Sequence, residues 1–206
     1  MTKAEKLLSK LHRRLRELEV LLPEETRKNI YPRDEQDSML GYRLLCHAEF
    51  EGFIEALVNL AVEEIWGTAR KTGNVTSAAQ AMLDFKDKCD FPPTSVSQKE
   101  KKGPIERLFG ITGDLGGRAR RNNGVTEKDI LNLFLPLGID HAAFDASWLD
   151  TMTAFGKSRG NVAHNSWENH SQYDTTPAKE KDAVGYALMG MESLVVFVDE
   201  IISKNI

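Results

Sequence analysis

The residues best suited to chemistry, by type and spacing, lie in the segment from Arg159 to His164, whose sequence is Arg-Gly-Asn-Val-Ala-His. Arginine stays charged and offers a planar fork of N–H donors that matches phosphate oxygens. Histidine titrates near neutrality, so it can accept or donate a proton during a reaction. The pair therefore suits a site that holds a phosphate and moves a proton beside it.

The spacing of this pair constrains how it can work. Arg159 and His164 are five residues apart, which is about 140° of rotation on a helix with ~100° per residue. We expect the two side chains to converge only if the segment begins a helix, with Ser158 as the N-cap. Arg159 could then swing over the helix N-terminus, which is itself a natural phosphate site. Val162 and Ala163 would pack inward while the polar residues face a cleft.

Other ionisable residues are weaker candidates. His47 is expected to pack or hydrogen-bond on a long helix, and His170 to lie in a loop. Glu51 follows His47 by one turn and could orient a motif side chain from a neighbouring helix, but a buried ion pair or a solvent-facing carboxylate fits equally well. The basic cluster from Arg118 to Arg121 could bind phosphate, although a solvated helix end that favours cations explains it more simply.

Several familiar sites have no counterpart in this sequence. There is no HExxH zinc motif, no paired Glu-x-x-His motif of the di-iron bundles and no GxSxG nucleophile. We therefore expect neither a metal nor another cofactor. A group of glycines superficially resembles a phosphate loop, but it lacks a preceding strand and a GKS/T ending, so we expect these residues to serve turns and close packing. They are Gly110, Gly113, Gly116 and Gly117.

The elements that position these residues are predicted to be helices, because apolar residues recur with a helical period along most of the chain. Thr126 with Asp129 three residues later is typical of a helix start, and so is Thr176-Pro177. The last helix is apolar almost all round, so we expect it in the core or in a subunit interface. The expected helices are one ending at Pro23, 38–71, 76–88, 104–123, one after Thr126, 143–155 closed by Gly156, a short one from Ser158, and the last from Thr176, with a loop at 90–104.

These elements predict an all-α, up-and-down helical bundle with additional short helices, formed by residues 1–206 as a single domain. The formal net charge is −4, which argues against a generally basic, nucleic-acid-coating surface. Residues 99–128 nevertheless contain eight Lys or Arg against four acids, so a local basic patch is expected. Two isolated cysteines and the absence of a signal peptide or a membrane-spanning stretch favour a cytoplasmic location.

The motif and its placement resemble the HEPN superfamily of helical proteins. That family is marked by an Arg, a polar residue next to it and a His a few residues later, late in a helical bundle. Here the matching residues are Arg159, Asn161 and His164, with Gly160 standing where the family has its polar residue. The long helix with His47–Ile54 is similar to the second helix of the RiboL-PSP-HEPN/MAE-like branch.

The resemblance implies a metal-independent endoribonuclease that acts as a homodimer, with His164 and Arg159 of both protomers forming one catalytic site. RNA supplies its own nucleophile, the 2′-OH, so the protein needs an acid, a base and positive charge on the phosphorane. The family likeness further implies substrate binding by Asn161, Asn165 and Lys157, with Glu51 in a supporting role. It also implies a toxin or phage-defence effector, with an antitoxin or another protein as a possible partner. The alternative is a non-catalytic HEPN-like module that binds a nucleotide or a protein.

Overall fold

The computed structural model describes residues 1–26, 31–89, 103–165 and 175–204, and within these ranges the side chains of residues 89 and 160–165 lie outside the description. The described residues form helices and contain no β-strand, which confirms the all-α prediction. The helices are α1 Lys3–Leu18, α2 Arg33–Thr72, α3 Ser77–Cys89, α5 Pro104–Arg120, α6 Glu127–Phe134, α7 Ala146–Asn165 and α8 Pro177–Ser203, with short 3-10 helices at Glu19–Leu21, Leu135–Leu137 and His141–Ala143. The 90–104 loop prediction falls almost entirely outside the described residues.

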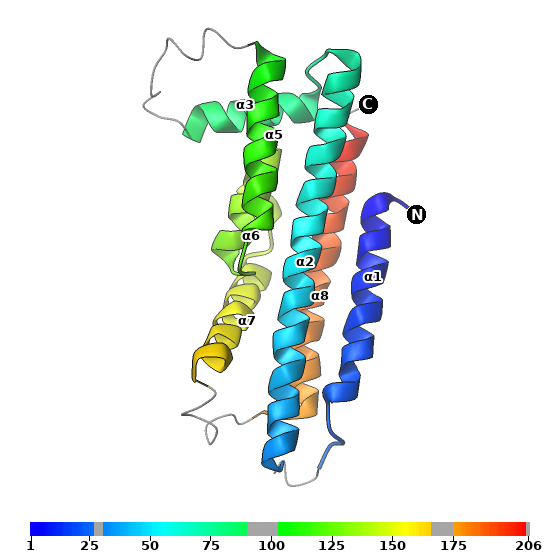
Figure 1. The fold of residues 1–206 in the computed structure, drawn as a ribbon, viewed down its shortest axis with the longest axis vertical. Helices are drawn as coiled ribbons and strands as arrows, with labels where there is room; N and C mark the ends of the chain where they lie inside the picture. The colour runs from blue at the N-terminus through cyan, green and yellow to red at the C-terminus, as the bar shows by residue number, and fades with distance from the viewer. Residues whose placement is uncertain (27–30, 90–102, 166–174, 205–206) are drawn as a thin grey trace.

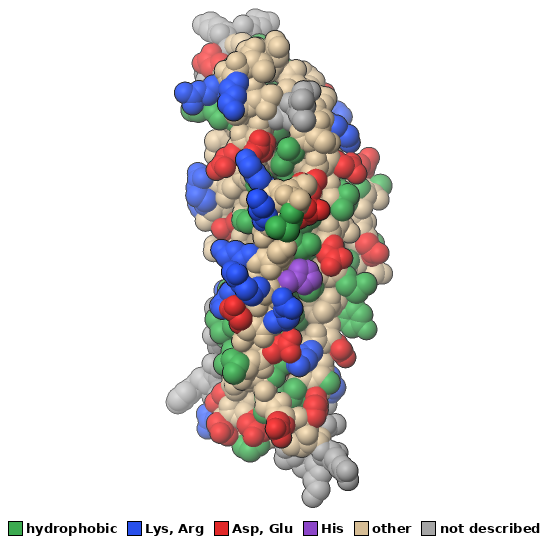
Figure 2. Space-filling view, turned by 90° about the vertical axis from the view of Figure 1, so that its right-hand side faces the viewer, with side chains coloured by type: hydrophobic (Ala, Val, Ile, Leu, Met, Phe, Trp, Pro, Cys, Tyr) green, Lys and Arg blue, Asp and Glu red, His purple; other side chains and the backbone are tan. Residues whose placement is uncertain are grey.

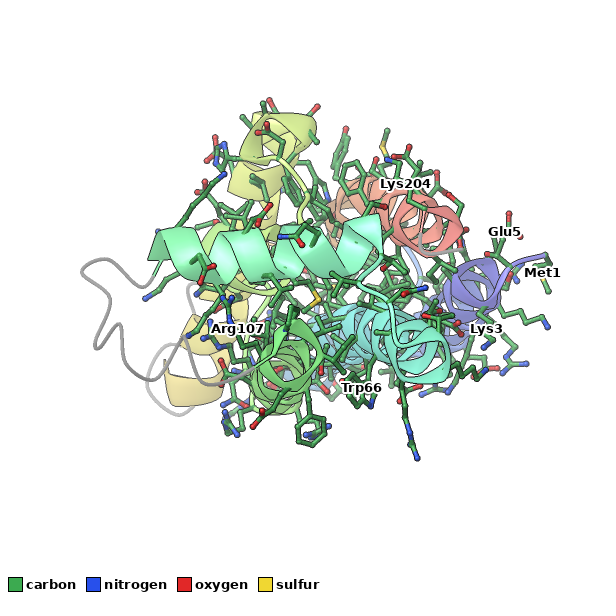
Figure 3. The ribbon with its side chains drawn as sticks, turned by 90° about the horizontal axis from the view of Figure 1, so that it is seen from above. Met1, Lys3, Glu5, Trp66, Arg107 and Lys204 are labelled. Atoms are coloured by element: carbon green, nitrogen blue, oxygen red, sulfur yellow. The ribbon has the colours of Figure 1, made fainter. Side chains whose placement is uncertain are left out.

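The helices alternate in direction, as an up-and-down bundle requires (Figure 1). α1 runs down, α2 returns up, α5 and then α7 run down, and α8 runs up again beside α2. Two helices together take the fourth position of the bundle. α5 lies along the upper half of α2 and α7 along the lower half, with α6 between them. α3 crosses the upper end, where Arg107 of α5 donates to Asp87 of α3 at 2.6 Å (Figure 3).

Local chemistry sets several helix ends where the sequence predicts them. Thr126 and Asp129 form the predicted capping box at the start of α6. Thr176 caps α8 by accepting from the backbone N–H of Lys179, and proline follows it at the first helical position. α2 ends at Gly73, whose φ of 70° is left-handed and suits a residue without Cβ.

The predicted helix break between Gly156 and Ser158 is wrong. α7 continues from Ala146 to Asn165 without interruption. Gly156 allows close packing instead, because a Cβ there would lie 3.1 Å from Cγ2 of Thr126 at the start of α6. Ser158 is not an N-cap, since it lies inside the helix and accepts a hydrogen bond of 2.5 Å from Nη1 of Arg43 on α2.

The core is built around α2, which packs against α1, α5, α7 and α8. Its apolar side chains are buried along most of its length, and Cys46 is buried among them. α8 is not buried on every side: Tyr186, Met189 and Val196 are 64%, 67% and 54% exposed. The side of the molecule that carries α1 shows cationic and anionic side chains interspersed (Figure 2). No helix in the described part of the chain has the length and apolarity needed to cross a membrane.

Candidate functional site

The predicted motif occupies the last two turns of α7, in the lower half of the bundle. Arg159 is half-buried and Lys157 is exposed. The backbones of Asn161, His164 and Asn165 belong to α7, but their side chains lie outside the described residues, as does all of His170. The motif therefore lies at the end of a long helix and does not begin one, so the predicted anion site at a helix N-terminus is wrong.

A continuous α7 keeps Arg159 and His164 about 140° apart around the helix axis. Arg159 cannot swing over a helix start to meet His164, because about three and a half turns of α7 precede it without interruption. The backbone of α7 thus places the two residues on different sides of the helix.

The α2 side chains on which the charge of Arg159 acts belong to a largely buried cluster. His47 is 1% exposed, and its ring stacks on Phe155 at 6.0 Å between centroids with an interplanar angle of 11°. Phe155 precedes Arg159 by one helical turn. Nδ1 of His47 lies 3.7 Å from Oε2 of Glu51, too far for a hydrogen bond, and this nitrogen has no partner among the described residues.

The charge states of this cluster follow from burial and from the guanidinium. Burial first, and then the positive charge of Arg159, lower the pKa of His47 to about 4. Burial raises the pKa of Glu51, and Arg159 opposes that rise. Near neutral pH His47 is therefore a neutral ring, unsuited to donating a proton. Glu51 is the carboxylate of α2 on which the charge of Arg159 acts, which fits the hypothesis that it orients the motif arginine.

A second cluster, which the sequence reasoning missed, fixes the residue directly before Arg159. Arg43 of α2 donates to both carboxylate oxygens of Glu180 on α8, with Nε to Oε2 at 2.9 Å, and also to Ser158 of α7. Thr175 donates to the same carboxylate at 2.5 Å. Glu180 is completely buried, so this ion pair joins three helices inside the bundle. The sequence offered one signal for this pair, because Arg43 and Glu180 are each a charged residue in an otherwise apolar stripe of their helix.

Two residues of the basic cluster, Arg118 and Arg121, lie beside α6. Arg118 and Arg121 line a cavity of about 370 Å³ together with Asn132 and Asp129. The charge of Asp129, which lines this cavity, also acts on His47 and Glu51 of α2. Among the described residues, no three His, Cys, Asp or Glu side chains are grouped as metal ligands.

Comparison with protein-family models matches residues 9–200 to the RiboL-PSP-HEPN family. The match covers most of the chain, including α2 and all of α7. The protein therefore belongs to the RiboL-PSP-HEPN family, which confirms the resemblance that the Arg159–His164 motif indicated. Neither curated proteins nor solved structures gave a match.

Proposed function

We propose that this protein is a metal-independent endoribonuclease in which Arg159 and His164 do the chemistry. The observation that carries the proposal is the placement of Arg159: it is half-buried on α7, its charge acts on Glu51 of α2, and Ser158 before it is held by Arg43. This placement fixes the start of a motif that a HEPN family member carries late in its bundle.

The proposed reaction is an internal transesterification. The 2′-oxygen of one ribose attacks the adjacent phosphorus while a histidine takes its proton, and the bond from phosphorus to the 5′-oxygen breaks. A second histidine protonates the departing 5′-oxygen, so the products are a 2′,3′-cyclic phosphate and a 5′-hydroxyl. Arginine stabilises the charge that builds on the phosphorane oxygens.

The reaction needs an acid and a base, whereas one chain contributes one motif histidine. We place the site between two copies of the chain, which brings two His164 and two Arg159 side chains to one groove. The exposed residues Tyr186, Met189 and Val196 of α8 support such a homodimer, because they lie within about 80° of one another around the helix. Light scattering at micromolar protein should give the mass of a dimer.

The remaining motif residues are assigned supporting roles. Asn161 and Asn165 would contact the RNA backbone beside the scissile phosphate, and exposed Lys157 would add positive charge on the same end of α7. Glu51 would hold the guanidinium of Arg159 in position from α2. In the cell, such an activity fits a toxin or a phage-defence effector controlled by an antitoxin or another partner.

The direct test is RNA cleavage by Arg159→Ala and His164→Ala. Loss of the proton-transfer group should slow cleavage by roughly 10²–10⁴-fold. Loss of the cation should slow it by roughly 10²–10³-fold. His141→Ala and Arg70→Ala are matched controls, because both residues are exposed and lie on other elements. If all four variants cleave as the unmodified protein does, the assignment of the site is wrong.

Gly160 supports one alternative, because it leaves the position after Arg159 without the polar side chain that the family has there. In that case the protein would be a non-catalytic HEPN-like module that binds a nucleotide or a protein. A wild-type protein that binds RNA without cutting it under any condition would favour this alternative.

A further inference from the structure

The side of the molecule formed by α3, α5 and α6 contains two adjoining cavities that the proposed chemistry does not use. The polar one has a volume of about 370 Å³ and is lined by Arg118, Arg121, three asparagines and Asp129. The other, of about 250 Å³, is mainly apolar, with Phe85, Leu131 and Pro136 among its walls. Arg118 and Asn132 line both cavities, so the two are neighbours.

The polar cavity contains positive charge that can be used for binding. Arg121 is exposed, and no described carboxylate pairs with it. Arg118 donates to Asp114 at 2.8 Å, but both side chains are about half exposed, and such surface pairs contribute little to stability. Asp129 is engaged by the capping box, where its Oδ2 accepts from Thr126. A phosphate could therefore draw on two arginines.

The glycines of α5 shape this surface. A Cβ at Gly117 would lie 3.3 Å from Nη1 of Arg121, so the missing side chain leaves room for that guanidinium to lie along the helix. The equivalent space at Gly116 is bordered by Arg120 and by Asn59 of α2. The close-packing role predicted from sequence thus holds for Gly117, whereas a Cβ at Gly116 would make ordinary contacts and one at Gly110 or Gly113 would meet nothing within 4 Å. Of the neighbouring residues Arg120 and Arg121, Arg121 lines the cavity and Arg120 does not.

The cavities lie close to the motif. The backbone N–H of Glu127, in the first turn of α6, donates to Oγ1 of Thr153 on α7 at 3.0 Å. Arg159 follows Thr153 by six residues, which is about 9 Å along the helix axis. The start of α6, whose Asp129 lines the polar cavity, therefore contacts α7 less than two turns before the motif.

We propose that these cavities bind one nucleotide of a single-stranded RNA at a distance from the scissile phosphate. Its phosphate lies against Arg118 and Arg121, its base enters the apolar cavity against Phe85, and Asn132 at the junction contacts the polar edge of the base. Unpaired bases favour such aromatic and aliphatic walls, whereas a base within a duplex cannot enter them. This inference rests on the proposed function in taking RNA as the ligand.

The test measures binding of a short fluorescein-labelled single-stranded RNA by fluorescence anisotropy, with every variant made on His164→Ala so that the probe stays intact. Arg121→Gln should weaken binding roughly five-fold, and should lower the slope of log affinity against log salt by about 0.7, the contribution of one phosphate contact. Arg120→Gln, which removes the same charge from the neighbouring residue, should leave that slope unchanged. Phe85→Ala should weaken binding roughly five-fold or more through lost stacking.

Thermal unfolding shows whether Phe85→Ala remains folded. If it does not, Arg121→Gln still tests the site, because Arg121 is exposed and its substitution should leave the fold intact. Equal effects of Arg121→Gln and Arg120→Gln would overturn the nucleotide site, even if the wild-type protein cuts RNA. A selective effect of Arg121→Gln on binding would support the site, even if the wild-type protein cuts nothing and the ribonuclease proposal fails. An RNA hairpin that binds as well as the single strand would also overturn it.

Discussion

Two arginines of this molecule lie in contrasting surroundings, one buried and paired and the other exposed. The first region, the seam, is the contact of α7 with α2 and α8 around Arg43, Ser158 and Glu180. There Arg43 is mostly buried, and it donates to Glu180 and Ser158. In the cavity beside α6, Arg121 is exposed and has no carboxylate partner among the described residues. The seam therefore fixes the helix that carries the motif, and the cavity keeps its charge available for a ligand.

The largest effect should come from removing the seam arginine. Arg43→Met leaves the completely buried carboxylate of Glu180 without its cation, which should lower the free energy of unfolding by about 3–5 kcal/mol. Arg121→Gln at the exposed cavity should change it by no more than about 0.5 kcal/mol. Urea denaturation of both variants measures the difference directly.

A double variant sharpens this contrast. Arg43→Met combined with Glu180→Leu removes both charges, and it should recover most of the lost stability because a buried pair often contributes little beyond apolar packing. If Arg43→Met alone costs no more than Arg121→Gln, the seam does not anchor α7 as described here.

A change in the packing of α7 against α8 should have the next largest effect on the free energy of unfolding. A Cβ at Gly190 would lie 2.1 Å from the ring of Trp148, whose Nε1 donates to the carbonyl of Ala187 at 3.0 Å. Gly190→Ala should therefore lower the free energy of unfolding by up to about 3 kcal/mol. Gly185→Ala on the same helix meets nothing within 4 Å, and should stabilise α8 by about 0.5–1 kcal/mol. Thermal unfolding that ranks these two variants in the reverse order would contradict the close packing.

His47 should make a smaller contribution to the free energy of unfolding, and this contribution depends on pH. Its pKa falls from 6.5 to about 4 on folding, so the unfolded chain binds more protons between these values and stability is lost as the pH falls. Going from about pH 7 to about pH 5 should remove about 2 kcal/mol through this one residue. Glu51 acts in the opposite direction, because its raised pKa favours the folded state at low pH.

Denaturation of the wild type and of His47→Gln at both pH values isolates this contribution. The variant should lack the loss assigned to His47 and keep the part due to Glu51. An identical pH dependence in the two proteins would mean that His47 is not held neutral in the core.

The sequence predicts the bundle well and the geometry of the motif poorly, for physical reasons. Apolar periodicity and capping residues such as Thr126 and Thr176 act locally, so they place most helices correctly. Gly156 looks the same in a sequence whether it ends a helix or allows close packing, and only Thr126 across the interface decides between these roles. Arg43 and Glu180 each stand out as a charge in an apolar stripe, but they lie 137 positions apart, so no local pattern shows that they pair with each other.

The central claim is that Arg159 and His164 use the 2′-OH of RNA as the nucleophile without a metal. The most direct measurement incubates the wild-type protein in EDTA with an RNA strand, the same strand methylated at every 2′-OH, and the matching DNA, and then identifies the ends of the products. The account predicts that only the unmodified RNA is cut, leaving 2′,3′-cyclic phosphate ends. Cleavage of the DNA or of the methylated strand, or complete loss of activity in EDTA, would contradict it.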